Sequence, residues 1–211
     1  MTVANLKTTL LRNARIVLPD RVVHPASLLI RDSLIAGVFE TSSTEHPVVD
    51  SIIDSSGLTL FPGFIDVHIH GAIGVDTLDA TAADLQRISA FLASNGVTGW
   101  LPTLVPAPTD VYERSTNAIT EARKQQLESG SNGEARILGV HYEGPFVNSI
   151  QCGALRPQFF RSFSQESDLN YVPMLGGAGA RHLMTVAPEV FGGYELVETL
   201  TRRGWIVSIG H

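Results

Sequence analysis

The chain has 211 residues, of which 44% are hydrophobic and 17% charged, so it can form a substantial folded core and is unlike a disordered segment. Its 21 acidic residues outnumber 15 Lys and Arg, giving a net charge of -6, and no basic run would neutralise nucleic-acid phosphates or an anionic membrane. The single cysteine, Cys152, excludes an internal disulfide and a thiolate metal cage. Neither a signal peptide nor a membrane span is recognisable. We therefore expect a cytoplasmic protein with neither nucleic acid nor membrane as a partner.

The first part of the chain reads as a small β unit. Between residues 10 and 60, apolar and β-branched residues occur in short runs that are separated by turns, such as the one at Asp32-Ser33, and this pattern predicts strands. The expected strands are ARIVL at 14–18, SLLIR at 27–31 and LIAGVF at 34–39. We therefore assign residues 1–57 to an N-terminal β domain.

From Leu58 to the last residue, strands and helices alternate, and we assign residues 58–211 to a second domain. Thr81 is followed three residues later by Asp84, as in a capping box, and Asn95-Gly96 supplies a helix stop. The expected helices cover 81–95, about 110–127 and about 193–203, and the expected strands cover the run that ends at 68–70, then 97–101, 136–141, 183–187 and 205–209.

Strands separated by helices predict a parallel sheet, and α/β barrels place their chemistry at the carboxyl ends of such strands. A closed eight-stranded barrel typically takes about 250 residues, whereas about five strands are recognisable here. We therefore predict an incomplete TIM-like (β/α)8 barrel, preceded by the β unit, and interpret the chain as the N-terminal part of a longer protein.

Imidazole and carboxylate groups recur where the predicted strands end. His68 and His70 are two residues apart in a strand, so both rings can face one metal ion. Glu143 follows the strand 136–141, and His211 follows the strand 205–209. This combination of oxygen and nitrogen ligands suits Zn²⁺ or a similar divalent ion, although two surface histidines near a loop would give the same HxH spacing.

The motifs around these residues resemble those of a known family. The run at 62–71, PGFIDVHIHG, is similar to the first-strand signature of the amidohydrolase superfamily of metal-dependent hydrolases. Three further segments are similar to one group within it, the N-acetylglucosamine-6-phosphate deacetylases. These segments are GVHYEGPF at 139–146, APE at 187–189 and SIGH at 208–211. The order and spacing agree over the whole chain, and the EGPF segment is the specific part.

The resemblance implies roles for four of these residues. Glu143 matches the metal-ligand glutamate of the family, and His211 matches its first metal-ligand histidine. His68 and His70 match a pair that binds a further metal in some members and is replaced in others. The last metal histidine and the catalytic aspartate of the family match positions beyond His211, so we assign no catalytic residue within the chain. The β unit corresponds to the start of a β-sandwich.

The implied reaction is the metal-assisted hydrolysis of the N-acetyl group of N-acetylglucosamine 6-phosphate, giving glucosamine 6-phosphate and acetate in amino-sugar catabolism. One or two divalent ions, with Zn²⁺ as the expected metal, lower the pKa of a bound water from 15.7 to about 7 in good sites. An aspartate then passes the proton to the leaving amine. The resemblance implies a small amino-sugar phosphate as substrate and a homodimer at full length, and we expect this chain alone to lack turnover.

One position departs from the family pattern. A histidine that reaches the acetamido group of the substrate is usual after Gly-Ala or Gly-Thr, but this chain has Leu155 after Gly153-Ala154. Leucine offers no donor to an oxyanion, and the loss of one such donor typically costs about 3 kcal/mol of transition-state stabilisation. We assign Ala154, through its backbone, and Leu155 to the substrate-binding segment, and this departure leaves the exact substrate and full activity open.

Other features favour less specific interpretations. We expect His141 to be a packed residue or a partner of a ligand, not a ligand itself. Cys152 is not expected to be a nucleophile, and Glu189 is expected to anchor a loop. The stretch 148–180 is too long for a plain connection, so it is either part of a sugar pocket or a flexible insertion.

Two alternative functions stay open at this point. Another amidohydrolase, such as a cyclic amidase or a base deaminase, needs only the HxH pair, but the EGPF segment argues against it. A non-catalytic remnant that only folds, or that binds sugar or metal, is consistent with Leu155 and with the part of the site that has no match in this chain.

Overall fold

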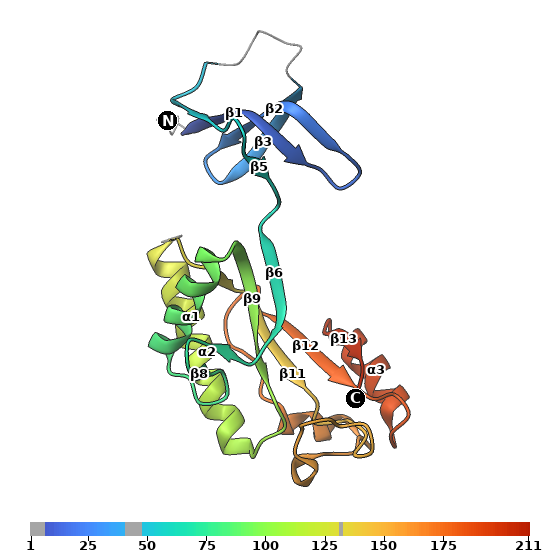
Figure 1. Cartoon of the computed structure of the whole chain (residues 1–211). Helices are drawn as coiled ribbons and strands as arrows, with labels where there is room; N and C mark the ends of the chain where they lie inside the picture. Colours follow the sequence, from blue (N-terminus) through green and yellow to red (C-terminus); the bar gives the residue numbers. More distant parts are fainter. Residues whose placement is uncertain (1–6, 41–47, 131–132) are drawn as a thin grey trace, which may run out of the picture. The chain divides into compact units, whose positions relative to one another are not determined.

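The structure is a computed structural model that describes residues 7–40, 48–130 and 133–211, and the chain divides into two compact units. The first unit is Met1–Pro62 and the second is Gly63–His211. Each unit has its own cluster of buried apolar side chains, so each is described separately below (Figure 1).

The first unit is a five-stranded sheet with the order β3-β2-β1-β4, in which β5 also pairs with β1. Its strands are β1 (Thr8–Val17), β2 (Val22–Arg31), β3 (Leu34–Glu40), β4 (Ser51–Asp54) and β5 (Thr59–Leu60). The first three strands pair antiparallel, whereas β4 and β5 run parallel to β1. Its small core contains Ala14, Ile16, Val23 and Ala26. A second, facing sheet is not present among the described residues of this unit, so the β-sandwich stays a prediction.

The second unit contains a curled parallel sheet. Its strands are β6 (Phe64–Ile69), β9 (Val97–Leu104), β10 (Arg136–Ile137), β11 (Gly139–Glu143), β12 (Arg181–Val186) and β13 (Ile206–Ile209). β6 pairs with β9, β9 with β11, β11 with β12 and β12 with β13, all in parallel. The short β10 also pairs with β9 and ends two residues before β11 begins. If β10 and β11 are counted as one interrupted strand, the sheet has five strand positions. The predicted mixed α/β half-barrel is therefore confirmed.

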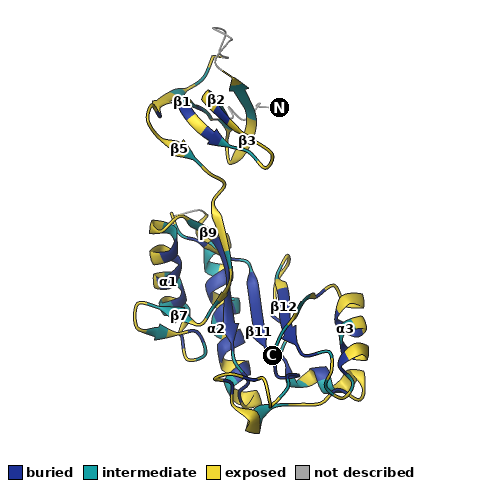
Figure 2. Cartoon of the chain, turned by 45° about the vertical axis from the view of Figure 1, so that its right-hand side comes forward, coloured by how far each residue is buried: buried dark blue, intermediate teal, exposed yellow. Residues whose placement is uncertain are grey.

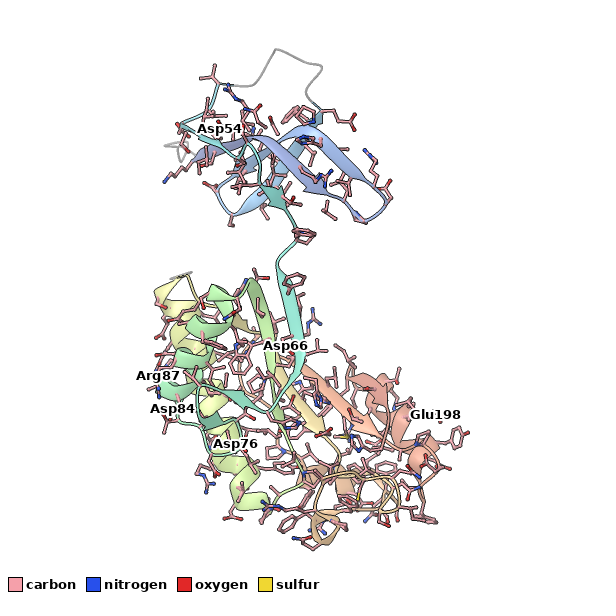
Figure 3. All side chains as sticks on the ribbon, viewed as in Figure 1. Asp54, Asp66, Asp76, Asp84, Arg87 and Glu198 are labelled. Atoms are coloured by element: carbon pink, nitrogen blue, oxygen red, sulfur yellow. The ribbon has the colours of Figure 1, made fainter. Side chains whose placement is uncertain are left out.

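Three helices cover this sheet (Figure 1). They are α1 (Ala82–Ser94), α2 (Thr109–Ser129) and α3 (Gly193–Arg202). In α1 the predicted capping box is present, because Thr81 and Asp84 exchange hydrogen bonds between side chain and backbone. Asp84 also pairs with Arg87, at 3.0 Å, on the exposed side of α1 (Figure 3).

The core of the second unit lies between the sheet and these helices. Leu85, Ile88 and Leu92 of α1 are 0–5% exposed, so one apolar face of this helix is buried in the core. All five residues of β11 are buried, whereas β6 is mostly exposed (Figure 2). Residues at the end of β11 are therefore held rigidly by packing, and those on β6 need other restraints.

Several short elements were not predicted from the sequence. A two-stranded hairpin, β7 (Gly71–Ala72) and β8 (Val75–Asp76), follows β6 directly. The stretch 148–180 contains two 3-10 helices, Pro157–Phe159 and Glu166–Tyr171. It also buries Phe163 and Leu169 in the main core. These elements have two, three or six residues and are too short to show a clear periodicity in the sequence. No helix among the described residues is long and apolar enough to span a membrane.

Candidate metal centre

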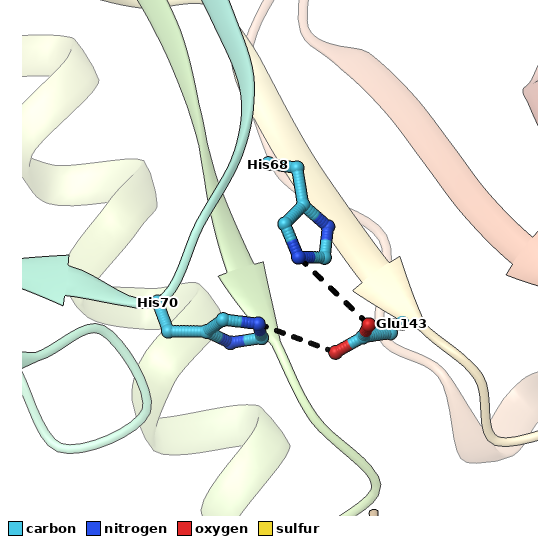
Figure 4. A group of neighbouring side chains, drawn as sticks. All are labelled: His68, His70 and Glu143. Atoms are coloured by element: carbon cyan, nitrogen blue, oxygen red, sulfur yellow. Dashed lines mark ion pairs between the residues drawn. The ribbon is translucent and has the colours of Figure 1, made fainter. Parts of the chain in front are cut away.

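The residues singled out by the sequence meet at the carboxyl ends of the parallel strands. His68 lies in β6 and His70 directly after it, Glu143 is the last residue of β11, and His211 follows β13. One oxygen of the Glu143 carboxylate is 3.8 Å from His68 Nε2 and 2.9 Å from His211 Nε2. The other oxygen is 3.3 Å from His70 Nε2. Two strands that are distant in sequence, β6 and β13, thus direct imidazoles at a carboxylate on a third strand, β11. Figure 4 shows His68, His70 and Glu143 of this group.

The local backbone explains how His68 and His70 reach this point. Because they are two residues apart in a strand, both rings lie on the same side of it, and their centroids are 4.8 Å apart. The chain then turns sharply at Gly71, where φ is +140°. A Cβ at this position would lie 1.9 Å from the carbonyl oxygen of Val75, so only glycine permits the β7–β8 hairpin to fold back beside His70.

The cluster has the chemical character of a cation site. One donor atom from each of His68, His70 and Glu143 lies within 4.8 Å of the others. The Glu143 side chain is 7% exposed, and no Lys or Arg in the described part of the chain pairs with its carboxylate. His211 contributes a further buried nitrogen, Nδ1, that has no hydrogen-bond partner. Within the described residues, the ion-pair partners of this buried carboxylate are all imidazoles. This arrangement fits a divalent ion, because a cation would compensate the charge of the carboxylate.

A buried histidine lies behind this cluster. His141 is 3% exposed, and its two ring nitrogens contact threonine hydroxyls: Nδ1 lies 3.2 Å from Thr103 Oγ1, and Nε2 lies 2.8 Å from Thr185 Oγ1. Burial lowers the pKa of His141 to about 4, and the neighbouring His68 adds to this effect. With both nitrogens engaged, His141 has no free donor for an ion, in agreement with the expectation that it is not a ligand.

The predicted substrate-binding segment lies beside His211. A Cβ at Gly153 would lie 4.0 Å from Cε1 of the His211 ring. The backbone N–H of Asn148 donates a hydrogen bond to the backbone carbonyl of His211. Ala154 is exposed. Leu155 is only 8% exposed and packs with Val147 and Cys152 in a small apolar cluster. The side chain of Leu155 is therefore occupied by packing, whereas Ala154 is open to a ligand.

Cys152 and Glu189, which the sequence did not assign to the metal site, each take part in a hydrogen bond. Cys152 is buried, and its thiol lies 3.2 Å from the Ser149 carbonyl. Glu189 accepts a hydrogen bond from the Asn148 side chain at 3.0 Å. Next to His70, a shallow and widely open depression of about 400 Å³ is lined by Gly71, Ala72, Gly74, Val75 and Asp76.

Sequence reasoning missed two residues of this region, Thr103 and Thr185. Both are buried threonines, on β9 and β12, and a polar residue at a buried strand position is a signal that could have been noted. Their partner could not be foreseen, because His141 lies 38 residues from one and 44 from the other.

The fold and the cluster together agree with the class that the sequence motifs predicted. The curled parallel sheet carries histidines and a carboxylate at the carboxyl ends of its strands, where α/β barrels place their chemistry, and this is compatible with the resemblance to the amidohydrolases. No family model matches the chain. Comparison with individual proteins is more specific.

The chain is similar over nearly its whole length to N-acetylglucosamine-6-phosphate deacetylases. It is 33% identical to the Homo sapiens protein of that name over 205 residues, and this aligned region covers 96% of this chain and 47% of the human protein. It is 31% identical over 206 residues to the Bacillus subtilis protein, covering 97% and 50%. An N-acetylgalactosamine-6-phosphate deacetylase of Escherichia coli is 28% identical over 204 residues. The resemblance predicted from the motifs is therefore confirmed.

Solved structures give the same result. An N-acetyl-D-glucosamine-6-phosphate deacetylase variant from Mycobacterium smegmatis, in complex with N-acetyl-D-glucosamine-6-phosphate, matches 97% of this chain and 50% of its own, with a TM-score of 0.76 and 25% identity. The N-acetylglucosamine-6-phosphate deacetylase from Thermotoga maritima matches 96% of this chain and 48% of its own, with a TM-score of 0.71 and 28% identity. The chain thus spans about half the length of the relatives that it matches.

Proposed function

We propose that the chain supplies the metal-binding part of a carbohydrate deacetylase that hydrolyses the N-acetyl group of N-acetylglucosamine 6-phosphate. One observation carries the proposal: the donors of His68, His70 and Glu143 lie within 4.8 Å of one another, at strand ends of a chain that resembles these deacetylases over 96% of its length. The products are glucosamine 6-phosphate and acetate.

The proposed ligands are Glu143, His68, His70 and His211. A bound divalent ion supplies a water of lowered pKa and polarises the amide carbonyl. Glu143, held by its buried strand, fixes the charge that attracts the ion, and the imidazoles add neutral nitrogen donors. Since the ligands are nitrogen and oxygen atoms, we propose Zn²⁺ as the metal. The two oxygens of Glu143 face different histidines, so sites for one ion or for two are both compatible with the cluster.

We place the substrate beside Ala154 and the depression next to His70. Leu155 offers no hydrogen bond to an acetamido group, so recognition there falls to the exposed backbone of the segment. The similarity to an N-acetylgalactosamine-6-phosphate deacetylase makes the epimeric sugar phosphate the second candidate substrate. From the resemblance we also propose a homodimer for the whole protein, and from the single cysteine a cytoplasmic location.

The metal proposal is tested by the metal content of the purified chain. After loading with Zn²⁺ and desalting, we expect at least one equivalent to stay bound, and Glu143→Gln should lose it because the buried charge is removed. Glu198→Gln, on the exposed side of α3, serves as the matched control and should retain the ion. Less than a tenth of an equivalent in the original chain would contradict the proposal and favour a non-catalytic remnant.

Turnover is tested by acetate release. We expect the 211-residue chain to bind the ion without releasing acetate from N-acetylglucosamine 6-phosphate, because no residue of this chain matches the proton-transferring aspartate of the family. N-Acetylgalactosamine 6-phosphate and a cyclic amide are assayed in parallel. Robust acetate release would overturn the prediction of inactivity, and hydrolysis of the cyclic amide alone would replace the deacetylase proposal with the alternative amidohydrolase.

A further inference from the structure

The backbone pairing that should hold His68 in place is interrupted. In the parallel pair β6–β9, Asp66 is opposite Trp100 and the next paired residues are Ile69 and Pro102, so β6 advances three residues while β9 advances two. His68 lies inside this irregular stretch. Pro102 also has no backbone N–H to donate to the neighbouring strand. The regular hydrogen bonds of the sheet therefore do not fix the segment that carries His68 and His70.

A side chain of β9 replaces the missing backbone contact. The backbone N–H of Ile69, which lies between the two histidines, donates a hydrogen bond of 2.9 Å to Thr103 Oγ1. Thr103 is 1% exposed, so water does not compete for this hydroxyl. Among the described residues, the Thr103 hydroxyl has one further hydrogen-bond partner, the side chain of His141.

His141 connects this hydroxyl to the strand that carries Glu143. It precedes Glu143 by two residues in β11, so both side chains are on the same side of a fully buried strand. Its ring contacts Thr103 on β9 and Thr185 on β12, and its centroid is 5.1 Å from that of His68. A continuous path of polar contacts thus runs from the backbone between the two β6 histidines to the strand of the carboxylate.

We propose that Thr103 and His141 are positioning residues that set the separation between the β6 histidines and Glu143, and thereby the affinity of the cluster for a divalent cation. This inference rests on the proposed metal site and adds the two residues that act through its ligands. Groups of this kind, which orient ligands without touching the ion, typically change metal affinity by about 10- to 100-fold when removed.

The test compares two buried threonines with Co²⁺ as the probe. Thr103→Val removes the hydroxyl at nearly constant volume, and Thr103→Ser restores it. Thr116→Val is the matched control, because Thr116 is 4% exposed and its hydroxyl donates, among the residues that the structure describes, only to backbone carbonyls of α2. Co²⁺ affinity is measured by titration of the 211-residue chain, and the visible spectrum of the bound Co²⁺ reports the ligand geometry.

We expect Thr103→Val to weaken Co²⁺ binding by about tenfold or more and to change the visible spectrum. Thr103→Ser should bind within about threefold of the original chain, since it retains the hydroxyl, and Thr116→Val should bind like the original chain. Equal affinity and spectrum for Thr103→Val and Thr116→Val would overturn the positioning role while leaving the metal site intact. Absence of Co²⁺ binding by the original chain would overturn both proposals.

A second pair of variants decides the question if Thr103→Val does not fold. His141→Gln is compared with His182→Gln, because His182 is also buried, at 7% exposed, but it contacts Leu175 and Trp205. Weaker Co²⁺ binding with an altered spectrum in His141→Gln alone supports the inference. The same loss in both variants would show a general effect of destabilisation and would overturn it.

Discussion

At the scale of single residues, the environment of His182 shows how tertiary packing fixes a protonation state. The Leu175 backbone N–H donates a hydrogen bond of 3.0 Å to His182 Nε2, and the ring lies 4.9 Å from that of Trp205. A nitrogen that accepts this bond cannot also carry a proton. Burial lowers the pKa of His182, and the charge of Arg123 lowers it further.

We predict that His182 makes the chain less stable in mild acid. The pKa of a histidine in the unfolded chain is about 6.5, and the pKa of His182 in the folded chain is lower. The unfolded chain therefore binds more protons than the folded chain as the pH falls below about 6.5. The stability that neutral His182 contributes is fully present above this pH and is lost as the pH falls further. Urea unfolding at about pH 7 and about pH 5 should show the advantage of the original chain over His182→Gln shrinking at the lower pH. A constant difference would contradict this prediction.

At the scale of elements, helix α1 owes its start to a local motif. Thr81 accepts a hydrogen bond from the Asp84 backbone, and the Asp84 side chain accepts one from the Thr81 backbone. These contacts satisfy two N–H groups that the first helical turn leaves without partners. Because the motif is local, it was recognisable in the sequence.

We predict that Thr81→Ala lowers the free energy of unfolding by about 1 kcal/mol, the usual value for a lost N-cap. This corresponds to a fall of about 2–4 °C in Tm, which is measurable by circular dichroism. Thr81→Ser keeps the hydroxyl and should stay close to the original chain. Equal effects of alanine and serine would indicate that the hydroxyl does not contribute.

Strand β11 depends on a contact that is not local. A Cβ at Gly139 would lie 1.8 Å from the carbonyl oxygen of Arg181, the residue opposite it on β12. Any side chain at this position would push the two strands apart just before His141 and Glu143. Gly139 is therefore required for the strand pairing that positions the cluster.

We predict that Gly139→Ala destabilises the second unit by at least about 2 kcal/mol, a typical cost of forcing extra volume into a packed region. Chemical unfolding followed by tryptophan fluorescence would measure the loss. Gly133→Ala is a useful comparison, since nothing lies within 4 Å of a Cβ at Gly133, although its positive φ adds some strain of its own. A smaller loss at Gly139 than at Gly133 would contradict the prediction.

At the scale of the whole molecule, the two units have separate cores and only one of them carries the candidate metal centre. All four cluster residues lie in Gly63–His211. Both tryptophans, Trp100 and Trp205, are buried in that same unit. Tryptophan fluorescence therefore reports on the unit that would bind the ion and not on the first unit.

We predict that Zn²⁺ stabilises the fluorescence-monitored transition. A ligand at 100 times its Kd adds about 2.7 kcal/mol to the free energy of unfolding, so Tm should rise by several degrees and fall again when EDTA removes the ion. Glu143→Gln should show no rise. A similar rise in that variant would place the bound ion elsewhere on the chain.

The sequence alone determined the order of the main elements and the motifs of the site. Alternating apolar patterns gave the helices and the parallel strands, because these patterns depend on the local periods of helix and strand. The HxH pair, Glu143 and His211 were also singled out as candidate ligands, because strand ends carry the chemistry of α/β folds, and their role as ligands stays a prediction. The 3-10 helices and the hairpin after Gly71 were not found, since they have too few residues for a period.

Only the tertiary structure decided which of these groups touch and what supports them. The 2.9 Å contact between Glu143 and His211 joins residues 68 positions apart, and the contacts of His141 join three strands. Leu155 was assigned from the sequence to the substrate-binding segment, and the structure adds that its side chain packs into a cluster with Val147 and Cys152. Such contacts depend on how strands curl and pair across the sheet, and that geometry arises from the packing of the whole unit and not from any local run of residues.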